Sequence, residues 1–115
     1  MIKIKNMSIE KQLDLKFPIY WNDWPIEKEF ARYLIYKIIT ERPNKIVEFG
    51  SGTSTLIIAK TLEKLGYDYN LISIDSDGGF LKKTKNLLIS ENIYGESKIE
   101  LIHAPIKDIE INGNT

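Results

Sequence analysis

The 115-residue sequence contains no cysteine and a single histidine. The lack of cysteine excludes a disulfide framework, a cysteine-based metal site and a cysteine nucleophile. We therefore expect no metal site. Sixteen basic residues balance sixteen acidic ones, so the chain lacks the excess positive charge of nucleic-acid-binding domains. We expect no nucleic acid among its partners.

Long apolar runs are also absent. The longest one falls far short of the ~20 residues that a membrane-spanning helix needs. Charged residues interrupt the N-terminal region at Lys3, Lys5, Glu10 and Lys11, so it does not resemble the apolar core of a secretion signal. These absences predict a cytoplasmic protein with no membrane partner. The chain is long enough for at most one domain, and its 43% apolar content suits a soluble globular fold.

The most informative stretch is residues 45–55, KIVEFGSGTST. Its first half predicts a short buried strand, and its last three residues predict the start of a helix. Between them, Gly50 and Gly52 allow a tight turn, because a Cβ would block both the turn and the close approach of a ligand. The amides of such a turn and the positive end of the helix dipole form a cradle for a nucleotide-like ligand.

Two carboxylates limit the choice of ligand. Dinucleotide sites favour an apolar strand followed by G-x-G-x-x-G, whereas here Thr55 takes the third glycine position. Glu48 would repel a diphosphate and attract a cation. Asp75, at the end of the next predicted strand, can accept hydrogen bonds from both hydroxyls of a ribose. The alternative role of Asp75 is to cap the following helix, which Asp77 can do instead.

The rest of the pattern alternates helices and strands. Predicted helices cover residues 25–41, 53–65 and 80–94, and predicted strands cover residues 45–49, 69–75 and 98–103. Gly66 is expected to end the second helix in the left-handed conformation. Strands linked by helices form right-handed parallel pairs. The chain therefore predicts an α/β, Rossmann-like three-layer sandwich with parallel strands in the order 3-2-1.

Glu48, Gly50 and Gly52 resemble motif I of the class I S-adenosylmethionine-dependent methyltransferases, Glu/Asp-x-Gly-x-Gly-x-Gly, with Ser54 at the third glycine. The resemblance covers about residues 25–105 and corresponds to the N-terminal, cofactor-binding half of that fold. It implies S-adenosylmethionine as the cofactor. The implied cofactor-binding residues are Glu48, Gly50, Ser51, Gly52, Thr53, Ser54, Asp75, Ser76, His103 and Ala104.

The resemblance also implies a role for each part of the site. The glycine turn and Glu48 hold the methionine part of the cofactor, Asp75 binds its ribose, and Ser76 contacts its adenine. Many methyltransferases place an Asp near His103 and Ala104 to bind the adenine amino group, and this sequence has none there. His103 keeps three open roles: a structural residue at the strand end, an adenine contact or a general base. No catalytic residue is assigned.

The resemblance divides the chain into two regions. Residues 1–24 are an aromatic lead-in that either covers the cofactor as a lid or supports the next helix. Residues 25–115 are a partial Rossmann-like S-adenosylmethionine-binding domain that ends before a fourth strand. We expect a truncated or fragmentary methyltransferase whose first strand has an open edge. Residues 1–5, a partner chain or self-association are expected to cover that edge.

Three functions remain open from the sequence. The first is methyl transfer to an unknown acceptor, with this chain carrying the cofactor-binding half. The second is a non-catalytic module that binds the cofactor or a partner, because the isolated chain lacks the acceptor half. The third is a fragment of an NAD-dependent oxidoreductase, which Glu48 and Thr55 disfavour.

Overall fold

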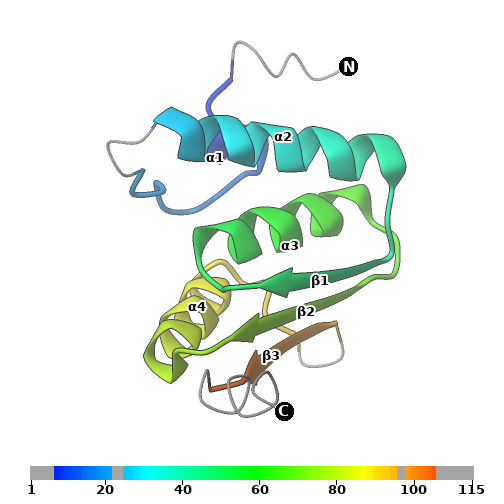
Figure 1. Ribbon diagram of the computed structural model, residues 1–115. Helices are drawn as coiled ribbons and strands as arrows, with labels where there is room; N and C mark the ends of the chain where they lie inside the picture. Colours follow the sequence, from blue (N-terminus) through cyan, green and yellow to red (C-terminus); the bar gives the residue numbers. More distant parts are fainter. Residues whose placement is uncertain (1–6, 22–24, 96–97, 106–115) are drawn as a thin grey trace.

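A computed structural model describes residues 7–21, 25–95 and 98–105 (Figure 1). In chain order the elements are α1 (Ile9–Gln12), α2 (Pro25–Glu41), β1 (Lys45–Phe49), α3 (Thr53–Leu65), β2 (Asn70–Asp75), α4 (Gly78–Ser90) and β3 (Ile99–His103). The alternation of helices and strands after residue 25 confirms the sequence prediction. Gly66 ends α3 with a φ of 81°, in the left-handed conformation that was predicted.

The three strands form one parallel sheet in the order β1-β2-β3, which confirms the predicted order 3-2-1. In this register Phe49 lies beside Ile74, and Asp75 lies beside His103. The carboxyl ends of all three strands therefore meet at one edge of the sheet. In open parallel sheets this edge is where ligands bind.

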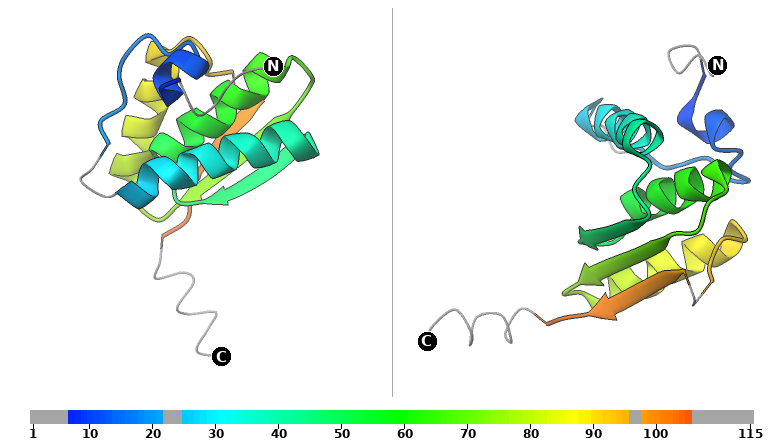
Figure 2. Two further views of the ribbon diagram at one scale, coloured as in Figure 1. Left: turned by 90° about the horizontal axis from the view of Figure 1, so that it is seen from above. Right: turned by 90° about the vertical axis from the view of Figure 1, so that its right-hand side faces the viewer.

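The hydrophobic core lies between the sheet and the helices. Figure 2 shows α3 and α4 on the same side of the sheet, as right-handed connections between successive parallel strands require, and α2 packs against α3. The main core cluster is built from α3, the strands and their neighbours, and its fully buried members include Ala59, Leu62, Leu71 and Leu88. A second cluster joins α1, α2 and α3 through Ile9, Leu13, Ala31, Ile35 and Ile57.

The prediction that β1 is buried is wrong for one of its faces. Ile46 packs against the core, but Val47 and Phe49 are 48% and 84% exposed. Successive side chains of a strand point to opposite faces, and no described helix covers the face that carries Val47 and Phe49 (Figure 2). We call this surface the bare face of the sheet. Ile72 and Ile74, next to them in register, are half-buried on it.

Several boundaries differ from the prediction by a few residues. α4 ends at Ser90 rather than near Gly95, because Asn92 adopts a φ of 60° and turns the chain out of the helix. β2 begins at Asn70 and β3 begins at Ile99, each one residue later than expected. His103 is the last residue of β3, where the predicted strand also ends.

The N-terminal region contains structure that the sequence did not predict. Residues 7–21, here called the N-terminal strap, include the short helix α1, whose first turn is capped by Ser8. The carboxylate of Glu91, a residue 1% exposed at the end of α4, accepts hydrogen bonds from the amides of Lys16 (2.8 Å) and Phe17 (3.1 Å). Asp14 pairs with Lys64 of α3 at 2.5 Å. These contacts support a structural role for the strap.

We expect Glu91→Ala to lower the free energy of unfolding by about 2–4 kcal/mol, because two amides lose a charged acceptor in a part-buried place. Urea unfolding monitored by circular dichroism measures this change. Glu41→Ala is the matched control, because its pair with Lys37 is exposed and such pairs contribute less than about 1 kcal/mol. Equal unfolding midpoints for the two variants would contradict the role given to Glu91.

Candidate functional site

The turn after β1 has the backbone that only glycine adopts easily. Gly50 and Gly52 have φ values of 94° and 144°. The amide of Gly50 donates to the carbonyl of Ile74 at 2.7 Å, which fixes the turn to β2. A Cβ added to either glycine would meet no atom within 4 Å. Backbone conformation therefore requires the glycines, and the turn borders open space that a ligand can enter.

Glu48 lies next to this turn, and its carboxylate is engaged within the protein. Its Oε1 accepts hydrogen bonds from the hydroxyls of Thr55 (2.5 Å) and Ser73 (3.0 Å), and its Oε2 accepts one from Ser54. Thr55 Oγ1 in turn accepts the amide of Gly52 at 3.1 Å. Thr55 and Ser73 are both 0% exposed. Glu48 therefore holds the start of α3 in place, and its contact with a ligand stays a prediction.

Asp75 joins the end of β2 to the glycine turn. Its Oδ2 accepts both the amide and the hydroxyl of Ser51, each at 2.8 Å, and its Oδ1 accepts the amide of Asp77 at 2.9 Å. The Asp77 amide, followed by the Ser51 donors, lowers the pKa of Asp75 against the opposing effect of burial. Thr84 of α4 donates to the Ser51 hydroxyl at 3.0 Å. Asp75 remains partly exposed, and a carboxylate oxygen can accept further hydrogen bonds.

Asp77, not Asp75, caps α4. Its Oδ1 accepts the amides of Gly79 (2.8 Å) and Phe80 (3.1 Å). A side-chain oxygen that accepts amides of the first helical turn is the usual N-cap arrangement. The capping role that was the alternative for Asp75 is therefore filled, and the Asp75 carboxylate stays at the carboxyl edge of the sheet.

The lowered pKa of Asp75 predicts how stability depends on pH. A carboxylate with a lowered pKa in the folded state stabilises that state above its unfolded pKa of about 3.9, and the effect is lost as pH falls through the folded pKa. We expect the wild-type protein to be more stable than Asp75→Asn at pH 7, with the difference shrinking towards pH 3. Urea unfolding of both proteins across this range measures the difference. A difference that stays constant with pH would contradict the assignment.

The remaining predicted residues lie at the same edge. Ser76 follows Asp75, and its carbonyl oxygen is 3.0 Å from Nε2 of His103, which requires a proton on that nitrogen. The amide of Ala104 donates to the carbonyl of Asp75 at 2.9 Å. His103 thus links the end of β3 to the loop after β2. This contact gives His103 a structural role at the strand end, and an adenine contact by His103 stays a prediction.

A hollow of about 500 Å³ opens beside the glycine turn. Its polar side is formed by residues 51–54, and its apolar side includes Trp21, Phe30 of α2 and Phe80 of α4. We call it the aromatic hollow. Phe30 and Phe80 are 53% and 54% exposed, and both side chains border the hollow rather than the core.

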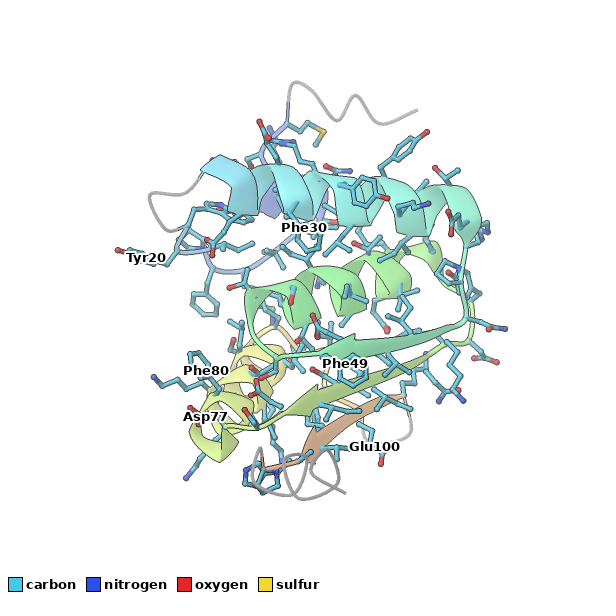
Figure 3. All side chains as sticks on the ribbon, viewed as in Figure 1. Tyr20, Phe30, Phe49, Asp77, Phe80 and Glu100 are labelled. Carbon is cyan, nitrogen blue, oxygen red and sulfur yellow. The ribbon has the colours of Figure 1, made fainter. Side chains whose placement is uncertain are left out.

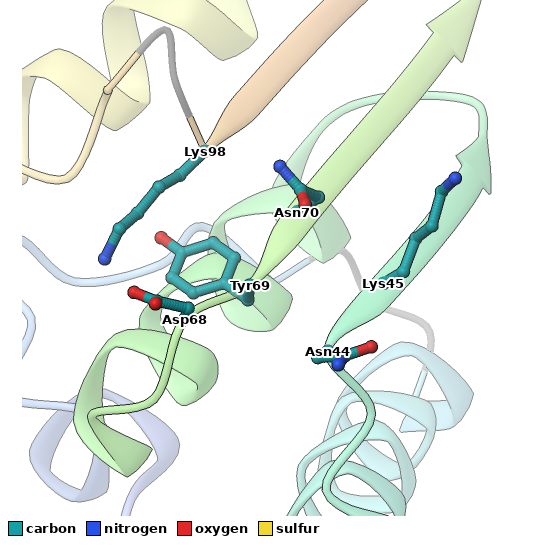
Figure 4. Close-up of a pocket in the computed structure, with 6 residues that line it drawn as sticks. All are labelled: Asn44, Lys45, Asp68, Tyr69, Asn70 and Lys98. Carbon is teal, nitrogen blue, oxygen red and sulfur yellow. The ribbon is translucent and has the colours of Figure 1, made fainter.

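A second hollow, of about 430 Å³, lies where the strands begin, at the opposite end of the sheet (Figure 4). It is lined by Asn44, Lys45, Asp68, Tyr69, Asn70 and Lys98. The Tyr69 hydroxyl, whose pKa is raised by burial and by Glu63, donates to Glu63 at 2.7 Å. None of the predicted site residues borders this hollow. The candidate site is therefore at the carboxyl edge.

Two other kinds of site are absent from the part of the chain that the structure describes. No group of three or more histidine, aspartate or glutamate side chains there could hold a metal ion. No helix of the described ranges is long and apolar enough to cross a membrane.

No protein-family model matches this sequence, and no curated protein sequence matches it. Solved structures do match. The O-methyltransferase TomG from Streptomyces achromogenes, in complex with S-adenosylmethionine, matches 91% of this chain with a TM-score of 0.59 and 17% identity. The S-adenosylhomocysteine-bound methyltransferase PaMTH1 from Podospora anserina matches 89% of it with a TM-score of 0.60 and 13% identity. The Bacillus cereus O-methyltransferase, in complex with S-adenosylhomocysteine, matches 99% of it with a TM-score of 0.59 and 13% identity.

The chain has the Rossmann-like fold of these methyltransferases. It spans 43%, 42% and 51% of their respective lengths. At such low identity the likeness establishes the fold, and function is a separate question.

Proposed function

We propose that this chain carries the S-adenosylmethionine-binding site of a methyltransferase. The observation that carries the proposal is the contact between the two predicted halves of the site. The Ser51 amide, in the glycine turn, lies 2.8 Å from the carboxylate of Asp75. Two segments that the sequence singled out separately are thus joined at the edge of the sheet where nucleotides bind.

The geometry fits the parts of this cofactor. Residues 50–54 form a cradle beside open space, and the first amides of α3 lack acceptors within the helix, which suits the carboxylate of the methionine part. The remaining acceptor capacity of Asp75 suits the ribose hydroxyls. Ser76, His103 and Ala104 lie beside Asp75 and are the proposed adenine contacts.

When bound, S-adenosylmethionine supplies a methyl group on a sulfonium cation. The protein then has to align an acceptor nucleophile with that methyl group, which is chiefly an effect of orientation. The matched solved structures support this cofactor, because TomG is in complex with S-adenosylmethionine and two others hold S-adenosylhomocysteine. A cytoplasmic location stays a prediction.

A second candidate is a module that binds the cofactor without turnover. This alternative stays a prediction. That a partner chain or a second copy covers the open edge of β1 stays a prediction. Residues 1–5, the third segment expected to cover this edge, lie outside the described residues. Methyl transfer to an acceptor by the chain alone would exclude this second candidate.

Calorimetric titration with S-adenosylhomocysteine and with NAD tests the proposed function. We expect S-adenosylhomocysteine to bind and NAD to bind much more weakly or not at all. Asp75→Ala is expected to weaken the binding at least tenfold, because the ribose hydroxyls lose a charged acceptor worth about 1.5–3 kcal/mol. Glu100→Ala, on the exposed bare face, is the control that leaves the affinity unchanged. Preference for NAD, or no binding by the folded protein, would refute the proposal.

A further inference from the structure

The aromatic hollow has an apolar wall of aromatic side chains opposite the polar glycine turn. Three aromatic rings from three separate parts of the chain line it: Trp21 of the strap, Phe30 of α2 and Phe80 at the start of α4. Figure 3 labels Phe30 and Phe80 on their separate elements. Both phenyl rings are more than half exposed, so neither contributes a closed core contact. Exposed rings that converge on one cavity are typical of a binding site for an apolar group.

Trp21 is held in this wall by a carboxylate. Oε2 of Glu10 accepts the indole Nε1–H of Trp21 at 3.3 Å and the amide of Ile19 at 3.0 Å. Glu10 belongs to α1, which is anchored in the second core cluster through Ile9. The position of the indole is therefore set by the packing of the strap, and Glu10 is a positioning residue for Trp21.

Charges of both signs lie around the aromatic hollow. The ammonium group of Lys28 lies 5.7 Å from the centre of the Trp21 ring, and that of Lys83 lies 5.7 Å from the centre of the Phe80 ring. Such cation–π contacts help to hold the two rings in place. Glu27, a carboxylate, is one of the residues that line the hollow itself. The rings of the wall can stack on a flat ring of a ligand or make edge-to-face contacts with it.

We propose that the aromatic hollow binds a flat aromatic ring of the methyl acceptor, with Trp21, Phe30 and Phe80 determining this specificity. The inference rests on the proposed function, because the polar side of the hollow is the glycine turn, residues 51–54. A ring in the hollow is thereby adjacent to the proposed place of the methionine part. The volume, about 500 Å³, lies within the range of small-molecule sites.

The probe is 2-naphthol, titrated by calorimetry with and without saturating S-adenosylhomocysteine. We expect Phe30→Ala and Phe80→Ala each to weaken naphthol binding about fivefold or more, through lost ring contacts. Tyr36→Ala is the matched control, because Tyr36 is a 57% exposed aromatic residue of α2 that does not line the hollow.

Substitutions of Glu10 test separately whether the position of Trp21 matters for ring binding. Glu10→Ala is expected to weaken naphthol binding, and Glu10→Gln is expected to restore most of it because the amide oxygen still accepts the indole N–H. A circular dichroism spectrum equal to that of the wild type ensures that each variant is folded.

The inference is overturned if 2-naphthol fails to bind, if the Phe30 and Phe80 variants bind it as the wild type does, or if S-adenosylhomocysteine competes with it. Competition would mean that the hollow belongs to the cofactor. Absence of S-adenosylhomocysteine binding counts against the proposed function instead. The naphthol titrations without it still decide whether the ring site exists, so the two failures are distinguishable.

Discussion

Replacing Glu48 with alanine is expected to lower the free energy of unfolding by about 2–5 kcal/mol, because two buried hydroxyls lose their acceptor. These hydroxyls belong to Thr55 and Ser73, both 0% exposed. Thr55 also accepts the amide of Gly52, so its displacement loosens the glycine turn. We therefore expect S-adenosylhomocysteine affinity to fall at least tenfold in the same variant. Urea unfolding and calorimetry measure the two effects.

Two further variants serve as controls for the substitution of Glu48. Glu48→Gln keeps one acceptor oxygen and is expected to show a smaller loss of both stability and affinity. Glu100→Ala removes an exposed carboxylate from the bare face and should change neither quantity by much, since isolated surface substitutions usually stay within about 0.5 kcal/mol. If Glu48→Ala had the same stability and affinity as Glu100→Ala, the hydrogen bonds of Glu48 would not be what holds the turn.

Gly52→Ala is the second substitution with a large expected effect. Gly52 has a φ of 144° and a ψ of −140°, a backbone conformation that residues other than glycine rarely adopt. Holding alanine there costs about 1–3 kcal/mol, or the turn changes its conformation to avoid the cost. A change in the conformation of the turn displaces the amides that follow. We expect calorimetry to show S-adenosylhomocysteine binding reduced at least tenfold or lost.

Gly95→Ala is the matched control for this backbone effect. A Cβ at Gly95 meets nothing within 4 Å, and Gly95 is not among the glycines with positive φ. A Cβ at Gly52 also meets nothing within 4 Å. The two glycines therefore differ in backbone conformation and in their position in the fold, and not in the space available for a side chain. Unchanged binding by Gly52→Ala, with Gly95→Ala as reference, would contradict the proposed cradle.

Local patterns were sufficient to predict the elements that position the site. The apolar stretch before Gly50 predicted β1, the glycines predicted the turn, and the position of Asp75 at the end of a strand placed its carboxylate at the carboxyl edge. Each of these signals depends on neighbours within a few residues. Helix and strand periodicity is a local property, and so is the φ requirement of glycine.

The missed features depend on distant parts of the chain. The contact between Glu91 and Lys16 spans 75 residues, and nothing in either local sequence indicates it. The apolar pattern of β1 predicts burial on both faces, whereas Val47 and Phe49 point to a face that no described helix covers. Ser73 was detectable in principle, because a polar residue inside an apolar strand requires a partner, here Glu48.

The most direct test of the central claim is a titration of the ¹⁵N-labelled protein with S-adenosylhomocysteine, followed by amide chemical shifts. We expect the largest changes at residues 50–55, at Asp75 and Ser76, and at His103 and Ala104. The amides around the second hollow, including Asn70 and Lys98, serve as an internal control and should stay unchanged. Changes confined to that opposite end of the sheet, or no changes in a folded protein, would contradict the assignment of the carboxyl edge as the cofactor site.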